Sequence, residues 1–152
     1  MSKIIFAALL CLSSLVHAVD QGELEAAKVS VLTLINAQRA TLGLSSLERE
    51  MALENEIQIH ADDMAAGRIP FGHEGFADRC ANARAAMPGS RYCGEIVAWG
   101  QKTPERVHLA WTNSPGHYAR MTDVRYTHAG FGYFINGQGR PYWGVLFLRY
   151  SR

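Results

Sequence analysis

The sequence has few cysteines, no excess of one charge and no apolar run long enough to span a membrane comfortably. Its 152 residues include 15 lysines and arginines and 14 acidic residues, and these form no basic or acidic tract. This balance argues against a nucleic-acid-binding protein and against electrostatic docking to a membrane surface. The length predicts one domain, large enough to bury a sizeable core without several cross-links.

Sequence signatures of several enzyme classes are also missing. His73-Glu74 lacks the second histidine that would complete an H-E-x-x-H zinc motif. The chain contains neither a G-x-S-x-G nucleophile elbow nor a G-x-x-x-x-G-K-S/T phosphate-binding loop. The sequence therefore gives no local signature of these enzyme classes.

The segment Met1–Ala18 predicts a signal peptide. Lys3 supplies a basic start, Ile4–Leu12 forms an apolar core, and Ala18 closes a small-residue cleavage site. Cleavage would leave residues 19–152 as one domain with equal numbers of basic and acidic residues, because Lys3 leaves with the peptide. We therefore expect a secreted or periplasmic protein, monomeric and without a transmembrane segment once the signal peptide is removed.

The cysteines that remain after cleavage form an even pair. Cys11 leaves with the signal peptide, and Cys80 and Cys93 stay. In an exported protein such a pair predicts a disulfide. The closed loop of about 14 residues would stabilise the fold by about 3 kcal/mol through loop-closure entropy. Without an accompanying cysteine and histidine cluster, the two residues make a poor zinc site.

The first part of the mature chain is typical of amphipathic helices. Apolar residues at helical spacing predict a helix over residues 22–40. Asn36 and Arg39 lie beside its apolar face, and we expect both to fasten neighbouring loops by hydrogen bonds. Ser45 and Glu48 fit a capping box, which predicts that a second helix begins there.

The middle of the chain predicts an irregular region, and the last quarter predicts a hairpin. Residues 67–92 are expected to form a long loop that the disulfide would staple. Residues 94–100 are interpreted as a short helix closed by glycine. Aromatic and β-branched residues predict strands over 129–135 and 142–150, joined by a glycine-containing turn. Helices first and a hairpin last indicate the α+β class, with helices packed on a small antiparallel sheet.

A histidine follows a predicted helix end. Thr103 and Pro104 predict the start of a helix, because Thr caps well and Pro suits the first helical position. Pro115 biases the residue before it out of the helical region, and Gly116 permits a sharp reversal. His117 is therefore expected just beyond a helix end, where it could point into a cleft.

Three polar residues stand out by their local context: His73, Glu95 and His117, each next to a glycine. Two imidazoles and a carboxylate can bind a divalent metal with an open position. They can equally act as acid–base groups, or simply make structural hydrogen bonds. His60, beside the apolar stripe of the second helix, is expected to be structural.

Six motifs follow one another along the mature chain. They are Leu34-Ile35-Asn36-Ala37-Gln38-Arg39 with Gly43-Leu44 and Leu47, His60-Ala61-Asp62-Asp63-Met64-Ala65, Phe71-Gly72-His73, Gly94-Glu95, Trp111-Thr112-Asn113-Ser114-Pro115-Gly116-His117, and Gly130-Phe131-Gly132 followed by Tyr142-Trp143 and Phe147. Their order resembles the CAP superfamily in its short bacterial form, that is, the SCP domain of cysteine-rich secretory, antigen 5 and pathogenesis-related 1 proteins. The resemblance covers essentially the whole mature chain.

This resemblance implies an α-β-α sandwich with a small central antiparallel sheet. It also implies a cleft where two histidines and acidic residues meet, which in some members is a divalent-metal site. By motif match, His73 and His117 take the histidine positions and Glu95 one glutamate position. Ser114 stands at the second glutamate position of the animal and plant pattern, and Ile96 replaces the asparagine usual in bacterial members.

Two functions are expected from this reading. The first is an extracytoplasmic binding module, whose ligand would be a small lipid, a polysaccharide or a partner protein. It would also hold an optional zinc-like divalent metal on His73 and His117. The alternative is a metal-assisted, peptidase-like hydrolase that uses His73, Glu95 and His117. No nucleic-acid partner is expected in either case.

Overall fold

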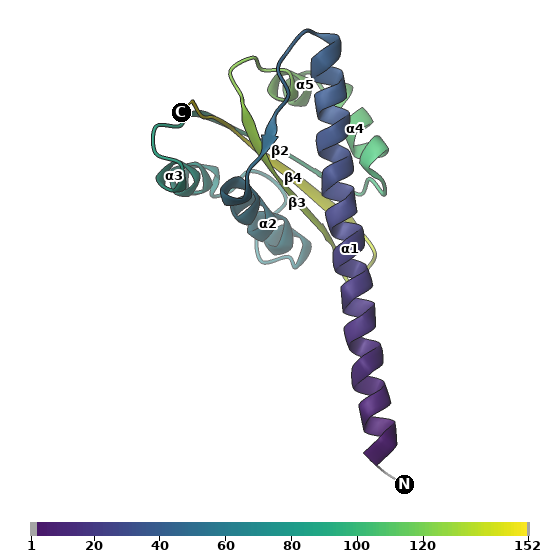
Figure 1. Cartoon of the computed structure of the whole chain (residues 1–152). Helices are drawn as coiled ribbons and strands as arrows, with labels where there is room; N and C mark the ends of the chain where they lie inside the picture. The colour runs from purple at the N-terminus through teal and green to yellow at the C-terminus, as the bar shows by residue number, and fades with distance from the viewer. Residues whose placement is uncertain (1–2, 152) are drawn as a thin grey trace.

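The computed structural model of the protein describes residues 3–151, with side chains from residue 21 onward (Figure 1). In chain order the elements are α1 (Lys3–Thr41), β1 (Glu48–Arg49), α2 (Met51–Ala65), α3 (Phe76–Ala86), β2 (Arg91–Trp99), α4 (Pro104–Thr112), α5 (Pro115–Met121), β3 (His128–Ile135) and β4 (Pro141–Arg149). The signal peptide stays a prediction, since residues 1 and 2 and the side chains of 3–18 lie outside this description. Among the described residues, no helix is both long and apolar enough to cross a membrane.

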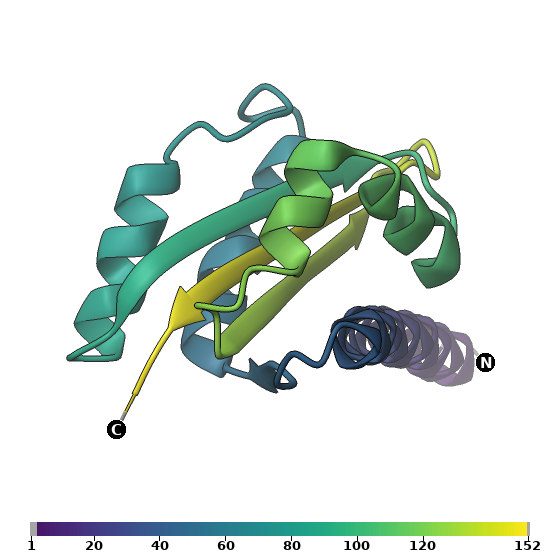
Figure 2. The same cartoon turned by 90° about the horizontal axis from the view of Figure 1, so that it is seen from above.

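A four-stranded sheet forms the middle layer, in the order β1-β3-β4-β2. β3 and β2 both pair antiparallel with β4, and the short β1 pairs parallel with β3. One face is covered by α1, α4 and α5, and the other by α2 and α3 (Figure 2). The predicted α+β class and α-β-α sandwich are therefore confirmed, with β1 adding a parallel edge to the antiparallel sheet.

Strand β4 joins the two helical layers through its alternating side chains. Trp143, Val145 and Phe147 point into the core shared with α1 and α4, while Leu146 and Leu148 point into the core shared with α2 and α3. Successive side chains of a strand face opposite sides, so one strand can serve both cores. Burying each such side chain contributes about 1.5–3 kcal/mol.

Glycines on the central strands let α2 lie directly on the sheet. A Cβ atom at Gly130 would lie 2.1 Å from the backbone nitrogen of Glu54, and one at Gly132 would lie 2.4 Å from the carbonyl oxygen of Ile57. The backbone of α2 occupies the space that side chains would take. The glycine pair of this motif is thus explained by close helix–sheet packing.

The polar residues predicted to fasten loops do so. The guanidinium of Arg39 is buried and donates to four backbone carbonyls, those of Ser45, Met121, Asp123 and Tyr126. Asn36 accepts from the backbone N–H of Leu47 and donates to its carbonyl. These bonds tie α1 to the segment that follows α5 and to the chain leading into β1.

The predicted capping box is wrong. Glu48 belongs to β1, where its backbone N–H donates to Thr127, and α2 begins only at Met51. The cap is Glu50, whose carboxylate accepts from the backbone N–H two residues on. Strand pairing with β3 satisfies the backbone here, so a tertiary contact overrides the local helix-start signal.

Two predictions in the middle of the chain are also wrong. The short helix expected over residues 94–100 is the strand β2, and the irregular region over 67–92 contains α3. Residues 94–98 of β2 are buried in succession, because side chains from both helical layers cover the strand. A strand buried on both faces lacks the alternation of apolar and polar residues that distinguishes a strand from a short helix. The hairpin of β3 and β4 and the helix start at Thr103 are confirmed.

Candidate functional site

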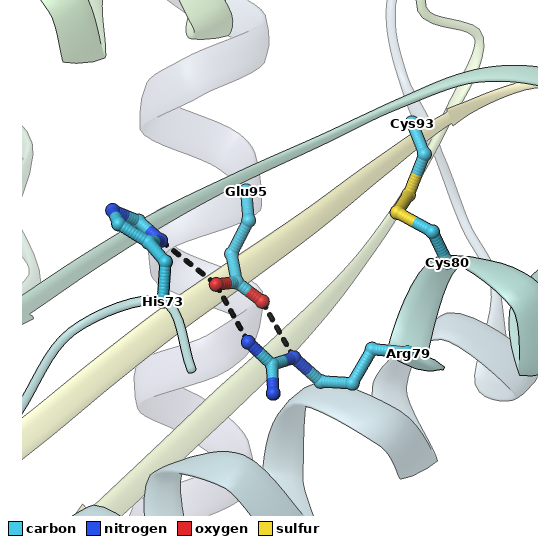
Figure 3. Close-up of a disulfide and its surroundings, with 5 residues drawn as sticks. All are labelled: His73, Arg79, Cys80, Cys93 and Glu95. Atoms are coloured by element: carbon cyan, nitrogen blue, oxygen red, sulfur yellow. Dashed lines mark hydrogen bonds and ion pairs between the residues drawn. A yellow bond between two sulfur atoms is a disulfide. The ribbon is translucent and has the colours of Figure 1, made fainter. Parts of the chain in front are cut away.

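A buried salt bridge connects β2 with α3. Glu95 is 6% exposed and Arg79 is 8% exposed. The arginine donates from Nε to Oε2 at 2.7 Å and from Nη2 to Oε1 at 2.8 Å, so both carboxylate oxygens are engaged (Figure 3). Its third nitrogen, Nη1, donates to the carbonyl of Glu74 at 2.7 Å. This fork geometry compensates two buried charges that would otherwise be costly.

His73 rests on the same carboxylate. Its Nδ1 lies 2.8 Å from Oε1 of Glu95, and its side chain is 53% exposed (Figure 3). A carboxylate held by arginine is an acceptor, so Nδ1 carries the proton and donates. In the neutral imidazole this leaves the lone pair on Nε2, which is the nitrogen that can accept a proton or ligate a metal.

The predicted disulfide is confirmed and lies beside this salt bridge. Cys80 and Cys93 are bonded, with their Cα atoms 6.0 Å apart. Cys80 directly follows Arg79 on α3, and Cys93 lies two residues before Glu95 on β2 (Figure 3). The cross-link therefore holds the arginine and the glutamate on their two elements within reach of each other.

His60 has the structural role that was predicted for it. It is buried on α2, and its Nε2 lies 2.8 Å from the carbonyl oxygen of Gly72. Burial lowers the pKa of His60, so the neutral ring with Nε2–H donating is favoured. This bond fixes the backbone immediately before His73.

His117 approaches from the other helical layer. Ser114 is extended, with φ −107° and ψ 113°, and Pro115 begins α5. His117 therefore lies beyond the end of α4, as predicted, but it is also the third residue of α5, a short helix that the sequence did not predict. His117 is half-buried. Its pKa is lowered mainly by burial and, to a smaller extent, by electrostatic repulsion from His73.

The predicted residues line one cavity beside β2. This strand ends the sheet order, and a hollow of about 350 Å³ lies against it. Its lining includes His73, Glu95, Ser114, His117 and Arg120. A neighbouring hollow of about 370 Å³ shares His73, Ser114 and His117 and is otherwise mainly apolar. We call the two hollows together the cleft.

Sequence reasoning missed the two arginines of the site. Arg79 was hidden because its helix was taken for irregular structure, although Phe76, Cys80 and Ala83 show helical spacing that could have revealed α3. Arg120 carries no local signal, because only the fold places the last turn of α5 beside β2. The roles of His73, Glu95 and His117 stay predictions.

The donor set suits a metal only in a limited way. His73 Nε2 and the imidazole of His117 are available, but both oxygens of Glu95 are occupied by Arg79. Among the described residues, no group of three or more histidine, cysteine, aspartate or glutamate side chains is arranged to hold a metal ion. A zinc-like ion on His73 and His117, with Glu95 orienting His73 through Nδ1, therefore stays a prediction.

The fold and the cleft define a class of proteins, the CAP superfamily. The sequence profile of the Cysteine-rich secretory protein family matches residues 32–147. This covers most of the chain, and the protein belongs to this family. The recognition made from the motifs is therefore confirmed.

Its relatives include proteins of several bacteria. An uncharacterized protein, YkwD, of Bacillus subtilis (strain 168) is 32% identical over 109 residues, which are 70% of this chain and 42% of the relative. The chain thus spans less than half of that protein. An extracellular SCP-domain protein from Bacillus anthracis str. Ames has a TM-score of 0.71 at 20% identity, over 82% of this chain and 41% of the other. An outer surface protein from Borrelia burgdorferi has a TM-score of 0.66 at 22% identity. The match covers 79% of this chain and 90% of the Borrelia protein. At these identities the two structures share the fold alone.

Proposed function

We propose that this protein is an extracytoplasmic binding module that holds a small ligand or a partner in the cleft. The observation that supports this proposal is the hydrogen bonding of Glu95, because both of its carboxylate oxygens accept hydrogen bonds from Arg79. A carboxylate held in this way is a fixed structural acceptor for His73. It is poorly placed as a general base, because it is buried and both of its oxygens already accept hydrogen bonds from Arg79.

Three observations support a place outside the cytoplasm. The sequence predicts a signal peptide, and the chain contains a disulfide of the kind that persists in oxidising compartments. Two proteins that share the fold are described as extracellular or outer-surface proteins. Secretion or periplasmic residence follows as part of the proposal.

An optional zinc-like ion belongs to this proposal. His73 Nε2 and His117 would hold it, and when bound it would polarise a carbonyl or phosphoryl oxygen of a ligand. His73 keeps its orientation through Nδ1 and Glu95, whether or not an ion is present. With two protein ligands, affinity is expected to be modest.

Calorimetry on the mature chain, residues 19–152, tests the site. Zn²⁺ should bind the wild type weakly and should bind His73→Ala and His117→Ala at least about tenfold more weakly. His108→Ala is the matched control, since this half-buried histidine pairs with Gln38 away from the cleft. If the wild type takes up no zinc, or if both cleft variants bind it equally well, the metal part is wrong. A fragment screen followed by NMR signals of the cleft histidines tests ligand binding itself, and no hit at either histidine would overturn the binding module.

A hydrolase remains the second candidate because of one geometric feature. The bond from His73 Nδ1 to Glu95 orients the imidazole as a base is oriented in hydrolytic sites, and Ser114 lines the same cavity. A peptide-substrate screen with and without Zn²⁺ discriminates the two functions. Turnover that disappears in His73→Ala would favour the hydrolase, and its absence under all conditions would favour the binding module.

A further inference from the structure

The charges around the first hollow leave a net positive group. Arg79 and Glu95 compensate each other in the buried salt bridge. Arg120 also lines the hollow, is exposed, and forms no salt bridge in the part of the chain that the structure describes. It lies in the last turn of α5 and so reaches the hollow from the side opposite to α3.

The buried ring of Tyr126 lies against β2 nearby. A Cβ atom at Gly94 would lie 2.1 Å from the Tyr126 hydroxyl oxygen, so the phenol touches β2 directly before Glu95. The carboxylates nearby are occupied or face elsewhere. Asp123 is bonded to Arg125, and Glu74 lines a different cavity, beyond Arg79. The hollow therefore presents one arginine and two imidazoles without a free acid to balance them.

The second hollow offers an apolar surface next to this charge. Phe71 and Trp99 are 45% and 44% exposed, and their ring centroids lie 6.0 Å apart. The guanidinium of Arg140 lies 4.4 Å from the Trp99 ring centroid and helps to fix that ring. Val97 and Ala110 continue the apolar lining. Small-molecule sites commonly combine such a lining with a few polar groups that set orientation.

The geometry points to a ligand class for the cleft: an organic carboxylate that carries an apolar group. The carboxylate lies at Arg120 beside the imidazoles, and the apolar group lies on Phe71 and Trp99. Arg is the side chain best suited to bind a carboxylate, and aromatic rings provide contact area at low entropic cost. The inference rests on the proposed binding function, which it narrows. Two sources share this chemistry, the C-terminal residue of a peptide and a free hydrophobic acid.

Binding of three probes to the metal-free mature chain tests the inference. N-acetyl-L-phenylalanine represents a peptide C-terminus, 3-phenylpropionate a free acid, and N-acetyl-L-phenylalaninamide a neutral comparator of the same shape. The imidazole NMR signals of His73 and His117 report occupancy of the cleft. The neutral amide should bind about tenfold more weakly than its acid, because it lacks the charge-assisted bond. Tighter binding of the acetylated acid than of phenylpropionate assigns the peptide source, and the reverse assigns the free acid.

Matched variants locate the two halves of the ligand. Arg120→Gln should weaken both acids about tenfold and leave the amide unchanged, whereas Arg84→Gln, on an exposed arginine of α3 that lines no part of the cleft, should change neither. Trp99→Ala should weaken all three probes about fivefold, whereas Ile59→Ala, at an exposed apolar residue of α2, should not. A thermal melt of each variant checks that the fold is kept.

The outcomes separate this inference from the proposed function. Equal affinity for the acid and the amide, or unchanged affinity of both acids for Arg120→Gln, would overturn the inference that Arg120 binds a carboxylate. Unchanged affinity of all three probes for Trp99→Ala would overturn the apolar contact. If none of the probes shifts the histidine signals but Zn²⁺ or another ligand does, the ligand class is wrong while the cleft still binds. If nothing shifts them, both proposals fall.

Discussion

The two sides of the cleft are built in opposite ways. On the side of α2 and α3, Glu95 is buried, bonded twice to Arg79, bonded to His73, and flanked by a disulfide. On the side of α4 and α5, His117 is half-buried and Arg120 is exposed, and neither side chain belongs to an ion pair among the residues whose side chains the structure describes. One side is fixed by mutual contacts, and the other has groups free to meet a ligand. A binding cleft needs both, because the fixed side supplies geometry and the free side supplies new bonds.

The largest difference between the sides should appear on removing an arginine from each. Arg79→Ala leaves the buried charge of Glu95 without a partner and should cost about 3–5 kcal/mol of unfolding free energy. Arg120→Ala should cost less than about 0.5 kcal/mol, since its side chain is at the surface. Urea unfolding at pH 7 measures both. Similar losses in the two variants would contradict the comparison, and recovery of stability in the double variant Arg79→Met, Glu95→Gln would support it.

Breaking the disulfide should loosen only the fixed side. The double variant Cys80→Ser, Cys93→Ser should lose about 3 kcal/mol by loop-closure entropy. The NMR signals of His73 should broaden while those of His117 stay sharp. Thiol labelling of the denatured, non-reduced wild type should find no free cysteine in the mature chain, and two labelled cysteines would refute the bond.

Arg39 holds the segment that follows α5, on the free side of the cleft. Three of the four carbonyls it binds belong to residues at and after the end of α5. Arg39→Ala should lower the unfolding free energy by about 1–3 kcal/mol, because buried acceptors lose their donor. It should also disturb His117 more than His73. An unchanged melting temperature together with altered ligand binding would reassign Arg39 from anchor to ligand contact.

The smallest effect is expected from pH, and it is shared by both sides. Burial lowers the pKa of His60 and of His117 below the ordinary value of 6.5. The unfolded chain then binds more protons than the folded chain below that pH, so stability falls as the solution is acidified through 6.5 toward the lowered folded values. Unfolding free energies from pH 7.5 to 5 should decline less in His60→Gln and His117→Gln. Slopes equal to the wild type in both variants would rule out these histidines as the cause.

The sequence predicted the parts of the fold whose signals are local. The hairpin turn, the first helix and the cap at Thr103 depend on residues close in the chain, and each is found. The disulfide followed from counting the cysteines that remain after the predicted signal peptide. The strand β2 was missed because both of its faces are covered, and Glu50 replaced the predicted cap because β1 pairs with β3. The salt bridge of Arg79 and Glu95 could not be predicted, since it depends on how α3 lies against β2.

The cross-link between Cys80 and Cys93 also makes maturation of the cleft depend on when and where the chain is oxidised. A chain that folds in a reducing compartment lacks the covalent tie, so Arg79 has to find Glu95 through packing alone. An exported chain forms the tie after transport, and the fixed side of the cleft then persists. Protein prepared in a reducing cytosol is therefore expected to be a mixture of molecules with and without the Cys80–Cys93 bond. Its oxidation state should be measured before any ligand or metal affinity is compared between preparations.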